Sequence, residues 1–159
     1  MSSIDDNQFL TFNCGEEVFA IKILGMKEIK EYSNITFVPM MPVSVRGVMN
    51  LRGNVLPIVD LNLRFGRDKT IPTKKTCIIV VETKQNEDKI DVGILVDSVK
   101  EVVDIPATEI EKPPGLGAKI RNDFISGIGK VGDEFVILLD VNKVLSVEEL
   151  SQLEEKIAT

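Results

Sequence analysis

The sequence predicts a mainly β fold made of two similar halves of short strands, with one α-helix at the C-terminal end. Three observations predict this fold class. Most apolar residues fall in short β-branched runs that are separated by Gly, Pro and charged residues. The order of apolar, Gly and Asp positions in the first half returns in the second half. The last stretch alone changes from strand-like runs to helical spacing of its apolar residues.

Residues 44–66 are the stretch around which the first half is organised. We expect a short strand at 48–51, between two glycines, and a longer strand over 55–63. The longer run is β-branched and aliphatic, and it contains Pro57, which disfavours a helix. Arg52-Gly53-Asn54 between the two runs has the composition of a tight turn, in which Gly or Asn tolerates a positive φ. The stretch is therefore predicted to form a hairpin with a cation at its tip.

The other strands follow from the same reasoning. Alternating or β-branched runs predict strands at 9–14, 18–23, 76–82, 90–96, 99–105, 124–131 and 134–141. Residues 26–32 fit either a short helical turn or another strand. The polar loop 67–75, which contains a proline, separates the two halves.

The C-terminal tail has a different pattern. Ser146-Val147-Glu148-Glu149 matches a capping box, in which a Ser and a Glu three residues later satisfy free backbone N–H groups. Val147, Leu150, Leu153 and Ile157 then recur at helical spacing. We therefore expect an amphipathic helix over 146–157, packed on the strands.

An internal repeat links the two halves. A shift of 73 residues places 19–32 on 92–105, and a shift of 80 places the stretch around Gly47 on 124–145. Gly47, Asp60 and Asn62 then align with Gly127, Asp140 and Asn142. Identities are few, so chance similarity stays an alternative. Duplication of a small β unit explains the shared order better, and five short strands per half could curl into a small barrel. The junction of the halves would be the natural binding groove.

The length and composition of the chain disfavour several classes of function. The 159 residues suffice for one domain or two small packed ones. A net charge of −6 disfavours nucleic-acid binding, which needs a basic face. The chain has no histidine, the commonest general base and metal ligand, which lowers the expectation of catalysis. There is no apolar membrane span and no signal peptide, so we expect a cytoplasmic protein without direct membrane insertion. Cys14 and Cys77 follow no metal spacing and are expected to be buried thiols.

Two motifs are better explained by structure than by chemistry. Residues 127–132 match G-x-G-x-x-G, but a strand rather than a helix follows, so a hairpin is favoured over a nucleotide loop. Asp60 and Asp140 could be paired carboxylates of a small hydrolase, which would require the two groups to lie within about 10 Å of each other. Their matching places at strand ends favour turn formation instead.

Arg52 has two interpretations. It could be a solvated charge at a hairpin tip. An Arg between Leu51 and Gly53 could also anchor an interface, because its planar guanidinium pairs with carboxylates while its stem packs on apolar groups.

At these residues the sequence resembles the CheW family of coupling proteins in bacterial chemotaxis. The segments that carry the resemblance are RGVMNLRGNVLPIVDL, VGILVDSVKEVV and GIGKVGDEFVILLDVNKVL. The similarity covers about 9–153 as a single CheW-like domain. It implies two intertwined five-stranded barrels of the Src-homology-3 kind that share a core, plus the C-terminal helix over 146–157. The first barrel would comprise about 15–70, and the second about 9–14 together with 76–142.

The resemblance also implies a function. Proteins of this family are non-catalytic adaptors without cofactors that couple the cytoplasmic tips of chemoreceptors to the histidine kinase CheA. An alternative is a CheW-like regulatory module cut from a larger signalling protein. The kinase regulatory domain would bind strand surfaces of the second barrel, at residues that the resemblance does not assign. The receptor-binding positions of the family correspond to Ile23, Met26, Glu28, Ile29, Gly47, Arg52, Val99 and Val102. At position 26 a methionine stands where small aliphatic residues are common.

Overall fold

The computed structural model describes residues 7–85, 87–112 and 124–145. The helix expected over 146–157 lies outside these residues. Eleven strands are described. They are β1 (Gln8–Cys14), β2 (Glu17–Lys22), β3 (Met26–Glu31), β4 (Val45–Leu51), β5 (Asn54–Asp60), β6 (Cys77–Gln85), β7 (Asp88–Val96), β8 (Ser98–Asp104), β9 (Ile110–Glu111), β10 (Ile125–Val131) and β11 (Glu134–Leu139). The helices are α1 (Leu61–Arg64), α2 (Val141–Val144) and the 3-10 turn η1 (Ala107–Glu109). In this part of the chain no helix is long and apolar enough to cross a membrane.

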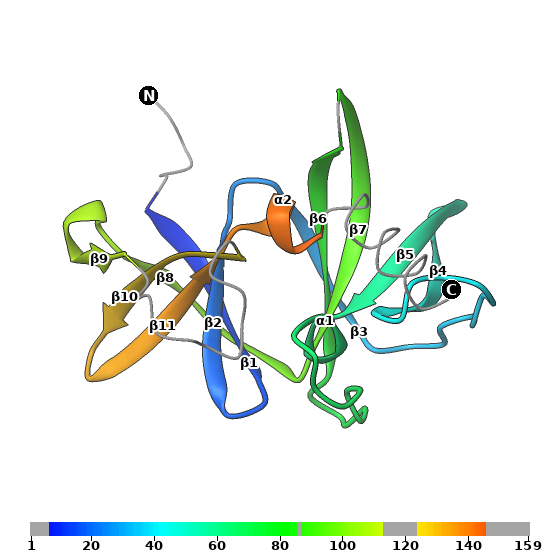
Figure 1. Cartoon of the computed structure of the whole chain (residues 1–159), viewed down its shortest axis with the longest axis horizontal. Coiled ribbons are helices and arrows are strands. Elements are labelled where there is room, and N and C mark those ends of the chain that lie inside the picture. The colour runs from blue at the N-terminus through cyan, green and yellow to red at the C-terminus, as the bar shows by residue number, and fades with distance from the viewer. Residues whose placement is uncertain (1–6, 86, 113–123, 146–159) are drawn as a thin grey trace.

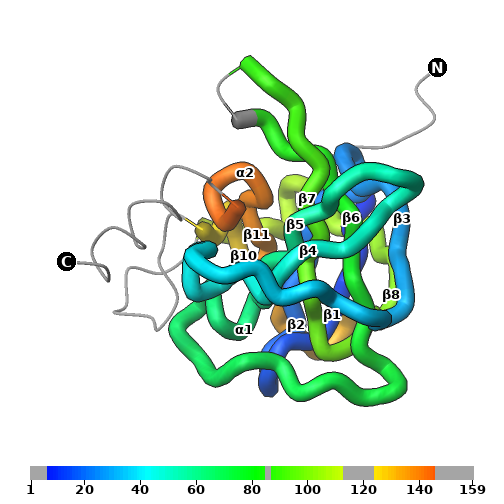
Figure 2. The backbone as a smooth tube through the Cα atoms, turned by 90° about the vertical axis from the view of Figure 1, so that its right-hand side faces the viewer, coloured from blue at the N-terminus to red at the C-terminus, as the bar shows by residue number. Residues whose placement is uncertain are grey.

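The strands form two sheets that stand side by side along the long axis of the molecule (Figure 1). The six-stranded sheet has the order β8-β1-β2-β11-β10-β9, and the five-stranded sheet has the order β3-β6-β7-β5-β4. Neighbouring strands are antiparallel except for β2 with β11 and β5 with β7. Figure 2 looks onto the five-stranded sheet, from which the β6–β7 hairpin projects. The prediction of a mainly β fold of two small Src-homology-3-like barrels is confirmed, with a sixth strand, β9, added to one of them.

The structure also confirms the internal repeat. Moved by 80 residues, Val45–Leu51 falls on Ile125–Val131 and Leu61–Arg64 falls on Val141–Val144, which are both pairs of observed elements. Moved by 73 residues, β3 falls on β8. The order β3-β6-β7-β5-β4 therefore matches the order β8-β1-β2-β11-β10. Residues 26–32, for which a helical turn was an alternative, contain strand β3.

The two repeats exchange their first hairpins. The β1–β2 hairpin of the first repeat joins β8, β10 and β11, whereas the β6–β7 hairpin of the second repeat joins β3, β4 and β5. The strands are therefore grouped differently from the predicted barrels of 15–70 and of 9–14 with 76–142. The reason is that apolar periodicity shows where strands lie but not which strand each one pairs with, and the parallel pairs β2–β11 and β5–β7 decide the grouping.

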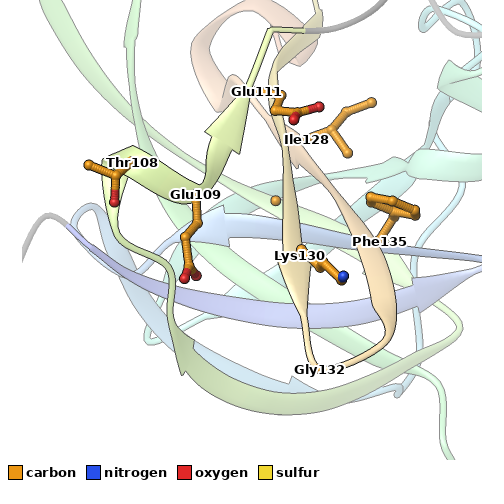
Figure 3. Close-up of a pocket in the computed structure, with 8 residues that line it drawn as sticks. Thr108, Glu109, Glu111, Ile128, Lys130, Gly132 and Phe135 are labelled. Atoms are coloured by element: carbon orange, nitrogen blue, oxygen red, sulfur yellow. The ribbon is translucent and has the colours of Figure 1, made fainter.

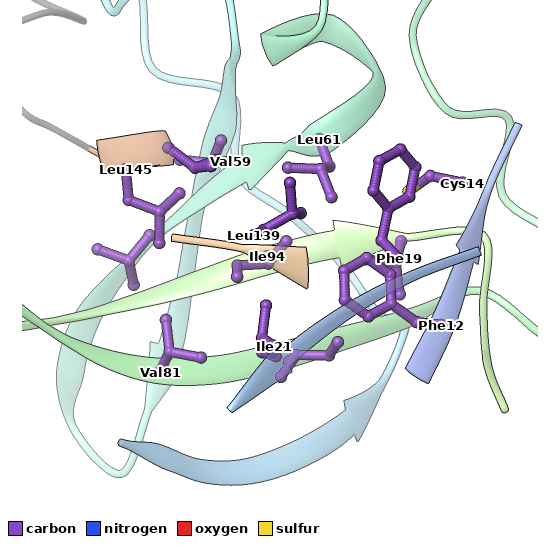
Figure 4. Packing of buried hydrophobic residues seen from close by; sticks show 14 of the residues in the cluster. Phe12, Cys14, Phe19, Ile21, Val59, Leu61, Val81, Ile94, Leu139 and Leu145 are labelled. Atoms are coloured by element: carbon purple, nitrogen blue, oxygen red, sulfur yellow. The ribbon is translucent and has the colours of Figure 1, made fainter. Parts of the chain in front are cut away.

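The exchange produces one shared core and a smaller core inside each sheet. Alternate residues of β6 show this, because Ile79 and Val81 belong to the shared core while Ile78 and Val80 point into the five-stranded barrel. Phe12, Phe19 and Phe65 fill one end of the shared core with contacting rings, and Figure 4 shows the first two near Cys14. Since both sheets supply this core, neither can bury its apolar surface alone.

The structure corrects two local predictions. The strand expected over 55–63 ends at Asp60, because the Asp60 carboxylate accepts hydrogen bonds from the backbone N–H groups of Asn62 and Leu63 and so begins α1. Cys14 is buried as expected, and burial raises the pKa of its thiol to about 12. Cys77 is only partly buried, because it lies at the edge of the shared core.

Candidate partner-binding site

Apolar side chains from two edge strands border the shared core. On β3, Met26 pairs with Val81 and Ile29 pairs with Ile79. Residues paired directly across two strands point to the same side of a sheet, and both partners belong to the shared core. The same holds on β8, where Val99 pairs with Phe12 and Val102 pairs with Leu10. Together with Ile23 in the β2–β3 turn they form what we call the junction strip: Ile23, Met26, Ile29, Val99 and Val102.

The junction strip is apolar and accessible. Ile29 is 42% exposed and Val102 is 51% exposed. Ile23, Met26 and Val99 are partly buried and pack against the shared core. An apolar surface that projects from a core at the edge of two sheets is suited to a partner helix.

Cys77 connects the two sides of the junction strip. It faces Glu31 across β3 and β6, and its thiol contacts the backbone of Val99 on β8. Burial raises the pKa of this thiol, and the hydrogen bond with the Val99 backbone opposes that change. The beginning of β6 is thereby held beside β8.

A β-bulge in each edge strand places these residues on one face. Met26 and Ile29 are three positions apart, as are Val99 and Val102, and in a regular strand such residues would point to opposite sides. The register of β3 shifts between Met26 and Glu28, and that of the β1–β8 pair shifts opposite Thr11. Each shift adds one residue to the edge strand and restores the common direction. Spacing of three in a strand also explains why the sequence of 26–32 resembled a helical turn.

The bulge in β8 is stabilised by a buried hydroxyl. Thr11 is 3% exposed, and its Oγ1 donates to the carbonyl oxygen of Glu101 at 2.8 Å. The same oxygen accepts from the N–H group of Glu101 at 3.1 Å. The hydroxyl therefore satisfies the backbone groups that the bulge leaves without a strand partner.

Glu28, Gly47 and Arg52 form a second group, on β3 and the β4–β5 hairpin. Arg52 and Gly53 are the two central residues of the turn and have φ values of 51° and 84°. The Asn50 side chain accepts a hydrogen bond from the Gly53 N–H group at 2.8 Å, which supports the predicted hairpin turn. Arg52 forms an ion pair with Glu28, and the two side chains are 71% and 26% exposed. β3 and β4 are the two edges of the five-stranded sheet, so this pair spans from one edge to the other.

Gly47 is buried and has a structural task in this arrangement. A Cβ atom at Gly47 would lie 2.2 Å from the carbonyl oxygen of Thr36. Thr36 and Val48 exchange two backbone hydrogen bonds, of 2.8 and 2.9 Å, along the outer edge of β4. Because Gly47 has no side chain, the segment before β4 can cross the edge of β4 and form hydrogen bonds with its backbone.

The two aspartates at strand ends begin helices, as predicted. Asp140 caps α2 through the N–H group of Lys143. Asp60 is fully buried and accepts hydrogen bonds from Arg46 at 2.9 Å and from the Thr70 N–H and hydroxyl groups at 2.8 and 2.7 Å. A carboxylate with every lone pair engaged and no solvent access is unsuited to acid–base chemistry. Residues 127–132 lie in the β10–β11 hairpin, as expected.

Sequence reasoning missed a hollow on the six-stranded sheet. Its volume is about 450 Å³, and it is lined by Thr108, Glu109 and Glu111 on one side and by Ile128, Lys130 and Phe135 on the other (Figure 3). Phe135 is 67% exposed. An aromatic residue on the outward face of a predicted strand was the available signal in the sequence.

Comparison with known proteins agrees with this architecture. The family model of the CheW-like domain matches residues 8–149. The chain is 34% identical over 144 residues to the chemotaxis protein CheW of Klebsiella aerogenes. The aligned region covers 91% of this chain and 84% of that relative. The chain is 38% identical over 138 residues to the chemotaxis protein CheW of Helicobacter pylori, with 87% and 81% covered. The crystal structure of the scaffolding protein TtCheW from Thermoanaerobacter tengcongensis matches with a TM-score of 0.79 and 31% identity over 90% of each chain.

Two joined barrels with an apolar strip at their junction define a protein of the scaffold class, which acts by binding and not by catalysis. The chain belongs to the CheW family of chemotaxis scaffold proteins. The resemblance seen in the sequence is confirmed, and a hydrolase using Asp60 and Asp140 is excluded by the family and by the burial of Asp60.

Proposed function

We propose that this protein is a cytoplasmic adaptor that couples the tips of chemoreceptors to the histidine kinase CheA within receptor arrays. The junction strip is the observation that carries the proposal. A receptor tip is a hairpin of two helices, and a helix presents apolar side chains at spacings of three and four residues. The strip offers a matching apolar surface, built on two rigid edge strands and continuous with the core.

Arg52 is proposed as the polar anchor beside this surface. In the free protein its guanidinium is paired with Glu28, and both side chains remain in contact with solvent. Exposed ion pairs of this kind contribute about 0 to 1 kcal/mol, so an acidic side chain of the receptor can replace Glu28 at little cost. Glu28 holds the flexible Arg52 side chain in place until the receptor binds.

The kinase regulatory domain is proposed to bind strand surfaces of the six-stranded barrel. That barrel contains β10 and β11, which fall in the predicted second barrel, and its outward face carries the exposed Phe135. Each interface is expected to be small, about 1,200 Å² or less, with avidity in an array supplying the remaining stability.

The first experiment is a titration of this protein into the kinase together with a receptor cytoplasmic fragment, with ATP turnover as the readout. A saturable change in turnover that requires both partners is expected. If turnover is unchanged while both partners are shown to be active, the coupling function is wrong.

Variants then test the two parts of the receptor site. Arg52→Glu is expected to weaken receptor binding at least tenfold, or about 1.4 kcal/mol, without changing the fold. Lys89→Glu is the matched control, since Lys89 is also a hairpin-tip cation, with a side chain 66% exposed. Val102→Asp should weaken binding similarly, and Ile90→Asp on the β6–β7 hairpin should not. Unchanged receptor affinity in Arg52→Glu would remove Arg52 from the site.

A further inference from the structure

The edge strand β8 contains one residue more than the part of β1 that it faces. β8 lies at the end of the six-stranded sheet, and its neighbour there is β1. Between the pairs Asn13–Ser98 and Gln8–Asp104, β1 has six residues and β8 has seven. The Asn13 side chain donates to the Ser98 hydroxyl at 2.8 Å and holds one end of this stretch. The additional residue is therefore accommodated inside the strand, as the bulge opposite Thr11.

The place of this bulge decides where two residues of the junction strip point. Val99 lies on one side of the bulge and Val102 on the other. Side chains alternate along a strand, so a bulge that moved past either valine would turn that valine to the opposite face of the sheet. The strip keeps both valines only while the bulge stays between them.

The Thr11 hydroxyl marks the place of the bulge. It donates to the carbonyl oxygen of Glu101 at 2.8 Å and accepts from the Glu101 N–H group at 3.1 Å. A hydroxyl can donate and accept at once, whereas a methyl group of similar size can do neither. Thr11 is 3% exposed, so a bulge at another position would leave a buried hydroxyl without its partners.

The five-stranded sheet has a valine at the equivalent position. The pairing of β3 with β6 matches that of β8 with β1, so Val80 corresponds to Thr11 and Glu28 corresponds to Glu101. Glu28 and Val80 are register partners, and Lys27 in this bulge pairs with acidic side chains of neighbouring strands. The use of a buried hydroxyl to hold the bulge therefore distinguishes the β8 side of the strip from the β3 side.

We propose that Thr11 is a positioning residue of the receptor site. Its hydroxyl fixes the bulge between Val99 and Val102 and keeps both side chains on the junction strip. Thr11 points away from the strip, since its neighbours Leu10 and Phe12 both belong to the shared core. Thr11 therefore acts on receptor binding through β8 and not by contact, and this role rests on the receptor binding proposed above.

Two substitutions at Thr11 separate the hydroxyl from the methyl group. Thr11→Val keeps the shape and loses the hydroxyl, and it should bind a receptor cytoplasmic fragment about tenfold more weakly than the wild type, equal to about 1.4 kcal/mol. Thr11→Ser keeps the hydroxyl and should bind within about twofold of the wild type. Thr11→Ser should nevertheless unfold at a lower temperature, because it loses a buried methyl group.

Thr83→Val is the matched control. Thr83 is 1% exposed, and its hydroxyl donates to the carbonyl oxygen of Ile90 at 3.0 Å on the β6–β7 hairpin. The substitution removes a buried hydroxyl of the same kind away from the junction strip. Thr83→Val is expected to unfold at a lower temperature and to bind the receptor fragment like the wild type.

The bulge is also observed in the free protein, without a receptor. The methyl NMR signals of Val99 and Val102 report where these side chains lie, and hydrogen exchange of the Glu101 amide reports its bond to Thr11. In Thr11→Val both valine signals should shift, and the Glu101 amide should exchange at least about fivefold faster. Thr11→Ser should leave both measurements close to those of the wild type.

The outcomes separate this role from the proposed function. A wild type that does not bind the receptor fragment would contradict the proposed function, while the measurements on the free protein still decide whether Thr11 positions the strip. The role of Thr11 is wrong if Thr11→Val binds like the wild type or leaves the valine signals unchanged. It is also wrong if Thr11→Ser or Thr83→Val weakens binding as much as Thr11→Val, because binding would then follow stability and not the hydroxyl.

Discussion

In the five-stranded sheet the strand order β3-β6-β7-β5-β4 repeats the order β8-β1-β2-β11-β10 of the six-stranded sheet. The two sheets also share the same backbone arrangement at their outer edges. Val48 and Ile128 are equivalent, and each pairs with the segment that crosses the outer edge of its strand. Gly47 and Gly127 precede them, and a Cβ atom at either would collide with that segment. Features that depend on backbone geometry have been retained in both copies.

The side chains of the two sheets differ much more. In one repeat Asp60 is fully buried and organises Arg46 and Thr70, whereas in the other the half-buried Asp140 only caps α2. The bulge in β8 is filled by the Thr11 hydroxyl. In the bulge of β3, Lys27 instead pairs with Glu82 and Asp91 on neighbouring strands. Side-chain differences therefore give the two similar barrels different surfaces.

The largest expected loss of stability comes from substitution of Gly47, and its equivalent Gly127 should tolerate the same substitution better. At Gly47 the atom 2.2 Å from an added Cβ is a backbone oxygen, while at Gly127 the nearest atom, at 2.5 Å, is a methyl group of Ile110, which can move. Gly47 also has a φ of 149°, which L-residues rarely adopt. Gly47→Ala is expected to lower the free energy of unfolding by about 3 kcal/mol or more, and Gly127→Ala by about 1 to 2 kcal/mol. Urea denaturation measures both, and equal losses would contradict the difference in rigidity.

The next comparison concerns the aspartates that begin the two short helices. Asp60→Ala should cost about 3 kcal/mol, because it leaves Arg46 and two buried groups of Thr70 without their partner. Asp140→Ala removes one helix cap and should cost about 1 kcal/mol. Thermal unfolding of the two variants checks that Asp60→Ala loses more stability than Asp140→Ala. Equal losses in the two variants would show that the buried partners of Asp60 add nothing beyond its helix cap.

The smallest expected effect lies at the hairpin tips. Arg52 has a left-handed φ of 51°, and its equivalent in the second repeat is Gly132, with a φ of 61°. An arginine in this region costs about 1 kcal/mol relative to a residue suited to it, and this cost supports the proposed role of Arg52 in binding. Arg52→Asn creates an Asn-Gly turn and should stabilise the protein by up to about 1 kcal/mol while it weakens receptor binding. A loss of stability would mean that the Glu28 ion pair outweighs the strain.

Much of this protein follows from its sequence. Runs such as CIIVVE and FVILLD predicted the strands, and the internal repeat predicted two similar halves. The composition of Arg52-Gly53 predicted the hairpin turn. These features are local, because period-two burial and turn chemistry depend on neighbouring residues. The strand end at Asp60 was misplaced by three residues, since the capping hydrogen bonds of a single carboxylate decided it.

The tertiary structure alone decided which strands pair and which residues meet. Nothing in the β1–β2 hairpin itself indicates that it joins β8 and β11 and not β3 and β5, because parallel pairing between distant segments leaves no periodic signal. The bulges that turn Ile29 and Val102 to one side also arise from pairing, and so does the ion pair between Arg52 and Glu28. The sequence by itself determined the elements and the family, and the pairing of those elements determined the junction strip.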